Sequence, residues 1–565
     1  MSELATEPVP ARLEDTDPED RAWRSRVIDS LLIARIRAAA PWVLGTLAVL
    51  VLFDVAAVHA VAGSADNATV LLEGQSMSHG NVALSGWSLS LDSFWTVDVL
   101  FYAAAVALTG LHPGLLFFVP ALLASLVVVA AVQLARREFS GRRAVAAAVT
   151  VIGLLALPGP DLAYYLLQGP WHVGTVLWCL LGFAGLSRGR FGWGWAAATV
   201  LFAFGLLGDL LIVAFGIVPS MAAGVVAMIR TRRLRAGAAP LSAGLLSVGL
   251  AAAIRGLAEL SGTFTLVNRN IVVRLPRVAA NVGHLPNRVD AMLGVGSMPF
   301  KHMRNGALVL QGFHVVGLAI FCAGVLGALV ALVIGMTRGR PVGPQTAETW
   351  RMDDLLLFGV LGDLVLFVWG SPSGNLDYVK YLTAAVVFGV ILSGRLVGYV
   401  AVRFRARLLM FAAAVAVVVL AAFAVEFGQE LFHPVPEQPT AALGAFLASH
   451  GLHVGVGDYW SSSLVTVETD GAVAVRPVET RSIDQIIRFD RQSSVDWYRG
   501  QRFQFLVYDT SQPWHGVNSA SAIATFGRPT ASYSFGTYRV LTWRAGISVN
   551  PGPANSGSPL QLFFK

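Results

Sequence analysis

Long apolar runs separated by short basic segments dominate the first 430 residues of the chain. A membrane-spanning helix needs about 20 mostly apolar residues, and many of the runs reach or approach that length. The five basic segments between them are RREFSGRR (136–143), SRGR (187–190), RTRRLR (230–235), TRGR (337–340) and RFRAR (403–407). This pattern predicts a polytopic α-helical membrane protein.

The basic segments also predict which side of the membrane each loop faces. Lys and Arg concentrate in cytoplasmic loops, and RAWRSR (21–26) precedes the first apolar run. If the five later segments are also cytoplasmic, each interval between neighbouring segments holds an even number of spans. We therefore expect about eleven transmembrane helices, with the N-terminus inside and the C-terminus outside. The expected spans are 41–62, 114–135, 144–158, 172–186, two within 191–229, 240–256, 306–335, 353–370, 379–401 and 408–428.

Two long outer loops follow from this topology, at 64–113 and 257–305. The first contains an apolar run, 97–111, that is shorter than a standard span of about 20 residues. We expect this run to form a helix that lies at the outer membrane surface. The second loop is rich in arginine, although cytoplasmic loops usually hold the positive charge.

The last part of the chain, 429–565, has a different pattern. Charged and polar residues become more frequent, and short alternating runs such as LHVGVG, FQFLVYD and TYRVLTW are separated by turn residues. The pattern predicts an extracytoplasmic domain that is α/β or mainly β. The expected division is a cytoplasmic tail (1–40), a transmembrane domain (41–428) and this outer domain (429–565).

Composition agrees with a plasma-membrane protein. The chain has 565 residues, of which 55% are hydrophobic and 13% charged, whereas soluble proteins carry about 25% charged residues. The net charge of +7 does not indicate nucleic-acid binding, because the basic residues gather between apolar runs. Both cysteines, Cys179 and Cys322, lie inside such runs and predict neither a disulfide nor a metal motif. There is also no glycine-rich nucleotide-binding motif.

The stretch SLDSFWTVDVLFYA (90–103) places two carboxylates beside aromatic residues at the predicted outer surface. Asp98 could simply cap the helix that follows it. Alternatively, Asp92 or Asp98 is a catalytic carboxylate in a loop that Trp87, Phe94 and Trp95 anchor at the depth of the lipid headgroups.

Further polar residues fall on the predicted outer side of the bundle. Ionisable residues near or within spans are functional candidates by default, although each taken singly is more often a helix cap or an ion pair. The candidates for lining a cavity are Asp54, Asp161, His172, Asp209 and Asp377.

The basic second loop suits an anion, because arginine and lysine bind phosphate. An ordinary solvated loop would have the same composition. The candidates for a phosphate site are Arg269, Arg274, Arg277, Lys301, Arg304 and, from the turn NLDYVKYL, Lys380.

The order of these features resembles the GT-C membrane glycosyltransferases, which include protein O-mannosyltransferases and the aminoarabinose transferases of lipid A. The resemblance rests on VDVLFYAAAVALTG, the span LLFFVPALLASLVVVAAVQLA and the basic turn RREFSGRR, over about 85–145. The outer turns GDLL and DYVKYL and the stretch GLHVGVGDYWSSSLVTVET are also similar to parts of family members.

The resemblance implies that a sugar is transferred from a polyprenyl-phosphate donor to a cell-envelope glycan, lipid or protein on the outer face. A loop aspartate, Asp92 or Asp98, would be the general base, and basic residues of later outer loops would hold the donor phosphate. Trp460 and Trp514 of the outer domain are candidates for binding the acceptor, or core residues. No cofactor is implied with certainty, and the use of a divalent metal stays open because family members differ.

One feature departs from the family pattern. Many members have an acidic pair soon after the first span, whereas SADNATVLLEGQSMSHGN offers only Asp66 and Glu73. Either Asp92, Asp98 or Asp54 fills the catalytic role, or catalysis has been lost. The alternatives to an enzyme are a transporter or flippase for a lipid-linked substrate and a non-catalytic scaffold for envelope assembly.

Overall fold

The structure is a computed structural model that describes residues 18–551 apart from short gaps. The gaps are 188–190, 268–274, 296–307, 339–350, 371–375, 404–405, 483–484 and 513–515. The chain separates into two compact units, residues 1–49 and residues 50–565. Helix α1 (Pro18–Ala60) begins in the first unit and ends in the second, and all contacts discussed below lie within the second.

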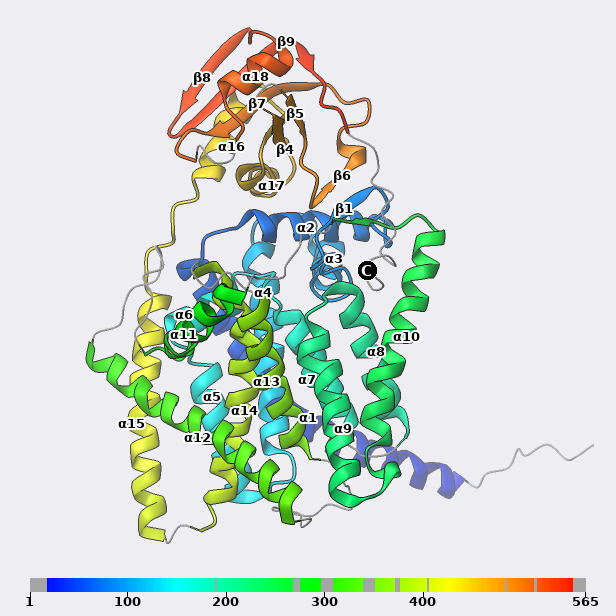
Figure 1. The fold of residues 1–565 in the computed structure, drawn as a ribbon, viewed down its shortest axis with the longest axis vertical. Helices are drawn as coiled ribbons and strands as arrows, with labels where there is room; N and C mark the ends of the chain where they lie inside the picture. The colour runs from blue at the N-terminus through cyan, green and yellow to red at the C-terminus, as the bar shows by residue number, and fades with distance from the viewer. Residues whose placement is uncertain are drawn as a thin grey trace, which may run out of the picture. The chain divides into compact units, whose positions relative to one another are not determined.

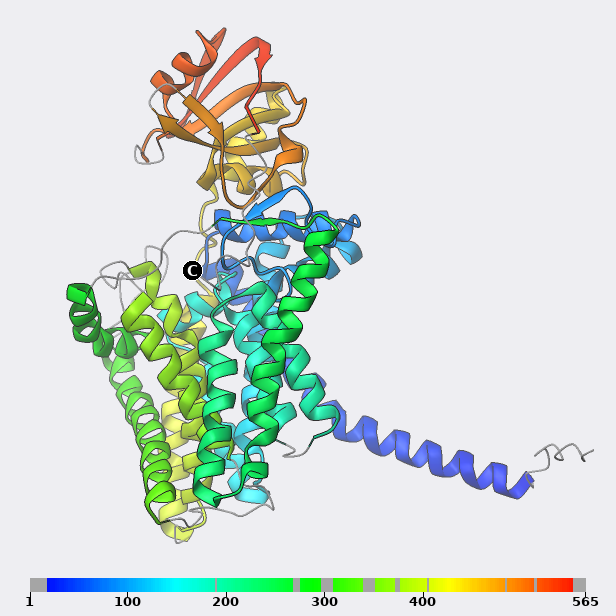
Figure 2. The ribbon, with the colours of Figure 1, turned by 45° about the vertical axis from the view of Figure 1, so that its right-hand side comes forward.

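Helices form the transmembrane part, and one lies at each of the eleven predicted positions within the described ranges (Figures 1 and 2). After α1 these helices are α4 (Leu115–Arg136), α5 (Gly141–Leu155), α7 (Val173–Leu186), α8 (Trp193–Gly208), α9 (Val218–Thr231), α10 (Ala238–Leu260), α12 (Leu308–Arg338), α13 (Met352–Gly370), α14 (Thr383–Val400) and α15 (Ala406–Leu431).

Length and apolar composition qualify seven helices of the described chain as membrane spans, or eight if α5 is joined to the short helix α6 (Pro160–Leu167). Helices α5 and α6 are bent by 84° at their junction. Helices α7 and α8 are apolar but shorter than a full span. The polytopic α-helical class is therefore confirmed, while the number of eleven spans stays a prediction.

The first outer loop folds into two helices, α2 (Ala65–Ser78) and α3 (Asp98–Thr109). Helix α3 confirms that the short apolar run 97–111 is helical. The two helices pack closely because α2 carries glycine at the contact: a Cβ on Gly74 would lie 2.6 Å from the Cβ of Tyr102. This close packing fixes the start of α3, where Asp98 lies.

A small sheet joins the two outer loops to the outer domain. Strand β1 (Trp87–Leu89) pairs in parallel with β2 (Thr265–Leu266) of the second loop and antiparallel with β6 (Ser493–Ser494). The three segments were predicted to lie on the same side of the membrane, and their pairing is consistent with that topology. Figure 1 shows β1 and β6 at the junction between the helices and the outer domain.

Several short elements connect the larger helices. They are the π-helical turn η1 (Val213–Ile217), the 3-10 turn η2 (Leu234–Ala236), helix α11 (Leu275–Met292) and the 3-10 turn η3 (Leu376–Leu382). Turn η3 leads directly into α14 and carries Lys380.

The outer domain is a mixed α/β domain, which confirms the predicted class. Its six-stranded sheet has the order β5-β4-β3-β7-β9-β8, with parallel pairs at the centre and antiparallel pairs at the edges. The strands are β3 (Val454–Asp458), β4 (Ala474–Ser482), β5 (Gln485–Arg488), β7 (Phe503–Asp509), β8 (Ala531–Phe535) and β9 (Tyr538–Ile547). The helices are α16 (Pro439–Ser449), α17 (Tyr459–Glu468) and α18 (Ser519–Phe526), and a 3-10 turn, η4 (Val495–Trp497), follows β6.

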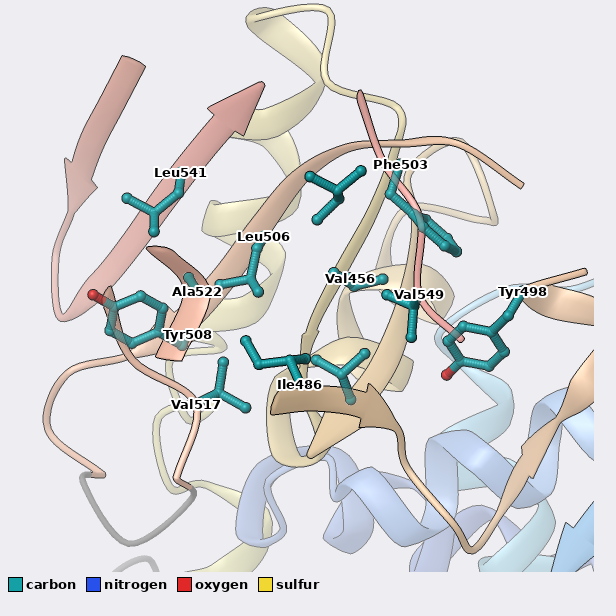
Figure 3. Close-up of a cluster of buried hydrophobic side chains, with 12 residues drawn as sticks. Val456, Ile486, Tyr498, Phe503, Leu506, Tyr508, Val517, Ala522, Leu541 and Val549 are labelled. Atoms are coloured by element: carbon teal, nitrogen blue, oxygen red, sulfur yellow. The ribbon is translucent and has the colours of Figure 1, made fainter. Parts of the chain in front are cut away.

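Alternation along the strands builds the core of this domain. One buried cluster contains Val456, Leu506 and Leu541 from neighbouring strands, with Phe503 and Tyr498 at one end (Figure 3). A second cluster, which includes Leu443, Val465 and Val507, uses the opposite face of the sheet. Because successive strand residues point to opposite faces, both faces of the central strands are covered.

Candidate active site

The centre of the candidate site is a buried pair between two helix ends. His172 precedes the first residue of α7 and Asp209 follows the last residue of α8. The Nδ1 atom of His172 lies 2.7 Å from Oδ2 of Asp209, and both side chains are almost fully buried. Asp209 also accepts hydrogen bonds from the hydroxyl of Thr175 and, at 2.9 Å, from the backbone N–H of Leu211. The carboxylate of Asp209 is therefore held in one orientation.

The loop that carries Asp92 and Asp98 is anchored to the same helix end. The backbone N–H of Phe94 donates to the carbonyl oxygen of Gly208 at 2.7 Å. The Phe94 ring lies against the His172 ring, with centroids 5.6 Å apart. Both residues have left-handed backbones, with φ of +53° and +64°. Such conformations cost energy in residues other than glycine and are found preferentially at functional sites.

The Asp98 carboxylate is buried, with 1% of the residue's surface exposed. It is the first residue of α3, where the helix dipole favours a negative charge. A Cβ on Gly174 would lie 2.7 Å from Oδ2 of Asp98, so the glycine allows this close approach. The same Oδ2 has no hydrogen-bond partner within the described part of the chain. Burial, with a further contribution from the Asp209 carboxylate, raises the pKa of Asp98 to about 7.

Asp92 differs from Asp98 because its side chain is only partly buried. Desolvation and the charge of Asp209 raise its pKa to about 6, while His172 and Lys380 act in the opposite direction. These mutual influences place Asp92, His172, Asp209 and Lys380 in one electrostatic cluster. Asp92 is thus the more exposed of the two carboxylates.

Lys380 supplies a cation to this cluster. Its Nζ atom lies over the rings of Trp171, 5.3 Å from the centroid, and Tyr381, 5.7 Å from the centroid. The His172 and Tyr381 rings are 5.2 Å apart, which brings η3 beside the His172–Asp209 pair. Lys380 forms no ion pair with any side chain that the structure describes. A partly buried ammonium without a carboxylate partner is suited to bind an anion.

No contact described above joins Asp54, Asp161, Arg277 or Trp460 to this cluster. Asp54 is partly buried in α1 and Asp161 is buried in α6. Arg277 is exposed on α11, and Trp460 is 51% exposed on α17. Five predicted residues and one side chain lie outside the described residues: Arg269, Arg274, Lys301, Arg304, Trp514 and the side chain of Asp377.

A second polar cluster, which the sequence did not indicate, joins the outer loop to the outer domain. The Tyr459 hydroxyl contacts Asp66 of α2 and Gln492. The Thr69 hydroxyl donates to the Ser463 hydroxyl at 2.8 Å. The contacts with α2 join residues about 390 positions apart in sequence, so only the fold brings them together. The sequence signal for this contact is weak, and it consists of the acidic residue Asp66 soon after the first span.

A metal site does not follow from the described geometry. No group of three or more His, Cys, Asp or Glu side chains in the described ranges is arranged to hold a metal ion. The candidate site is therefore a cluster of carboxylates, a histidine and a lysine at the ends of α7, α8 and α14 that are predicted to face outward.

Comparison with known proteins identifies the fold. No protein-family model and no curated protein matches the sequence. The structure is similar to ArnT from Cupriavidus metallidurans bound to undecaprenyl phosphate, with a TM-score of 0.51, 14% identity, and coverage of 90% of this chain and 98% of ArnT. The apo state of the same ArnT gives a TM-score of 0.50 at 13% identity, with coverage of 89% and 98%.

An oligosaccharyltransferase from Archaeoglobus fulgidus, in complex with Zn and sulfate, also matches. It has a TM-score of 0.45 and 13% identity over 89% of this chain and 74% of its own. The similarity to ArnT shows that this chain has the fold of that protein, which agrees with the fold that the sequence resemblance implies.

Proposed function

We propose that the protein is a membrane glycosyltransferase of the GT-C type that transfers a sugar from a polyprenyl-phosphate donor to a cell-envelope acceptor on the outer face. The observation that carries this proposal is one cluster that combines a reachable carboxylate, Asp92, with a cation, Lys380, that has no ion-pair partner among the described residues. Glycosyl transfer from a phosphate donor needs one group of each kind.

The donor explains why the cation lies at a helix end. A polyprenyl chain stays in the bilayer, so its phosphate lies at the depth where the helices leave the membrane. Lys380 lies in η3, immediately before α14. As the bond to the sugar breaks, negative charge develops on the phosphate, and the ammonium stabilises it. Arg269, Arg274, Arg277, Lys301 and Arg304 of the second outer loop stay candidates for further phosphate contacts.

Asp92 is the proposed general base. Its carboxylate takes the proton from an acceptor hydroxyl, whose oxygen forms a bond to the anomeric carbon. The bond between that carbon and the phosphate oxygen breaks, and its electron pair leaves with the polyprenyl phosphate. The buried His172–Asp209 pair keeps the charge around Asp92 fixed during this exchange. Asp98 is the second candidate, although a hydroxyl reaches it only after the loop moves.

The similarity to ArnT supports the type of donor. That protein is seen with undecaprenyl phosphate bound, and it covers almost the same length of fold as this chain. The outer domain is the proposed acceptor-binding part, and the exposed ring of Trp460 is a surface on which a sugar could stack.

Transfer from a panel of radiolabelled polyprenyl-phosphate sugars tests this function. Purified protein in liposomes, supplied with a cell-envelope extract as the source of acceptor, should form a labelled product with one of these donors, and not with the same sugars linked to nucleotides. Asp470→Asn in the outer domain is a matched control for carboxylate variants, because Asp470 is exposed and its left-handed backbone suits asparagine. Movement of the labelled lipid across the bilayer without any covalent product would instead support a flippase.

A further inference from the structure

A cavity of about 460 Å³ lies at the end of the helical bundle that is opposite to the candidate active site. It is lined by residues of α5, α12, α13 and α14 and of the turn after α14. Arg403 belongs to this turn, whereas Lys380 precedes α14, so the two cations are at opposite ends of that helix. The cavity is therefore separate from the Asp92 cluster.

Small residues on one face of α12 leave the space for this cavity. Gly324, Gly327, Ala328 and Ala331 line it at helical spacing, and Leu396 and Val400 of α14 form the facing wall. Leu329, Val330 and Val333 of α12 are exposed, as expected for side chains that face lipid. The cavity thus has an apolar wall next to a helix surface that contacts the bilayer.

Arginines line the end of the cavity. The charge of Arg395 is already paired within the protein. Arg395 contacts Asp353, and it donates to Glu138 at 3.1 Å and to the Tyr399 hydroxyl at 3.2 Å. Arg143 and Arg403 form no ion pair with the side chains that the structure describes. Their two charges are therefore available to a ligand.

The start of α5 adds a further preference for an anion. Arg143 lies in the first turn of this helix, and Ser140 does not cap the helix with its side chain. Free backbone N–H groups and the positive end of the helix dipole favour a negative ligand there, whereas an arginine is unfavourable unless an anion accompanies it.

We propose that this cavity binds an anionic glycerophospholipid. The headgroup phosphate would contact Arg143 and Arg403, and one acyl chain would lie along the small residues of α12. Basic pockets between transmembrane helices on the cytoplasmic side are suited to such headgroups, and RREFSGRR and RFRAR are both predicted to be cytoplasmic. The size is within the range of small-ligand pockets, about 300–1,000 Å³.

Lipid binding measured by native mass spectrometry tests the proposal. The purified full chain is titrated with dioleoylphosphatidylglycerol and, separately, with dioleoylphosphatidylcholine. We expect the wild type to prefer phosphatidylglycerol. The double variant Arg143→Gln/Arg403→Gln should weaken its binding roughly thirtyfold, which corresponds to two cations at a membrane surface. The matched control is Arg233→Gln/Arg235→Gln, because these arginines are exposed beyond α9 and do not line the cavity.

A second variant tests the cavity without changing charge. Ala331→Phe places a ring in the space for the acyl chain and should weaken phosphatidylglycerol binding while leaving both arginines in place. The proposal is overturned if both cavity variants bind phosphatidylglycerol as the wild type does. It is also overturned if they lose undecaprenyl phosphate instead, because the cavity would then hold the polyprenyl lipid.

Discussion

Two clusters of ionisable side chains lie at opposite ends of the helical bundle, and their charges are balanced differently. At the inner end, by predicted topology, Arg395 is surrounded by Asp353, Glu138 and Tyr399, and Arg230 forms two hydrogen bonds with Asp354 at 3.0 and 3.2 Å. At the outer end, the three carboxylates Asp92, Asp98 and Asp209 lie near His172 and Lys380. Within the described ranges, Oδ2 of Asp98 has no hydrogen-bond partner.

The difference separates a structural role from a functional one. A buried charge that is fully hydrogen-bonded holds helices together, and removing one partner is strongly destabilising. An unsatisfied buried carboxylate lowers stability instead, and such groups are retained where chemistry requires them. The Arg395 network has the hydrogen-bonded, structural type of charge. The cluster around Asp92 and Asp98 has the unsatisfied type that is associated with function.

The largest expected effect on stability is at the inner end. Arg395→Met removes a buried cation together with its hydrogen bonds to the partly exposed Asp353 and Glu138, and it should lower the free energy of unfolding by about 3 kcal/mol. Thermal unfolding in detergent measures this change. Arg233→Gln is the control, since Arg233 is exposed, does not line the cavity and should unfold like the wild type. An unchanged melting temperature of Arg395→Met would show that the network does not hold α5, α13 and α14 together.

Neutralising Asp98, at the other end of the bundle, should raise the free energy of unfolding instead. The pKa of Asp98 is about 7 in the folded state, above its ordinary value of 3.8. The folded state therefore holds a proton that the unfolded state releases, and wild-type stability falls as pH rises from about 4 to about 7. Asp98→Asn should remove this loss and stabilise the protein by on the order of 2–4 kcal/mol above pH 7.

Unfolding of both proteins at several pH values measures this gain. It should grow between pH 4 and pH 7 and then stay constant. A variant that is destabilised at pH 8 would mean that the Asp98 carboxylate has a stabilising partner.

The cation of the outer cluster should affect chemistry more than stability. Lys380→Met removes the proposed contact to the donor phosphate and should lower the rate of transfer about 100-fold, as loss of one charge-stabilising donor commonly does. Lys380→Arg keeps the cation and should retain most of the activity. Equal activity of Lys380→Met and the wild type would remove Lys380 from the phosphate site.

A smaller effect is expected from the glycine that faces Asp98. Gly174→Ala places a Cβ 2.7 Å from Oδ2 of Asp98 and should destabilise the protein by about 1–3 kcal/mol. Gly249→Ala in α10 is the matched control, because a Cβ added there would have no described atom within 4 Å. Thermal unfolding of the pair compares them, and similar melting temperatures would show that α3 and α7 are not tightly packed here.

Much of the fold follows from the sequence because apolar runs and basic loops report on the membrane directly. The helix positions, the short outer helix at 97–111 and the outer domain were all predicted from such patterns. The same topology placed Asp92, Asp98, His172, Asp209 and Lys380 on one side, and the structure brings them together.

Contacts between distant helices could not be predicted in this way. The pairing of Arg395 with Asp353, and of His314 with Glu426, depends on helix rotation and register, which the spacing of a single sequence does not specify. The same is true of Tyr459 and Asp66, which meet only after the outer domain has folded against α2.

The most direct test of the account is the rate of sugar transfer by Asp92→Asn in liposomes, with a donor that the wild type uses. The substitution keeps the size of the side chain and removes its ability to accept a proton. The account predicts a loss of about 10²–10⁴-fold, with normal binding of the donor lipid and normal activity of Asp470→Asn. Wild-type transfer by Asp92→Asn would contradict the assignment of Asp92 as the base.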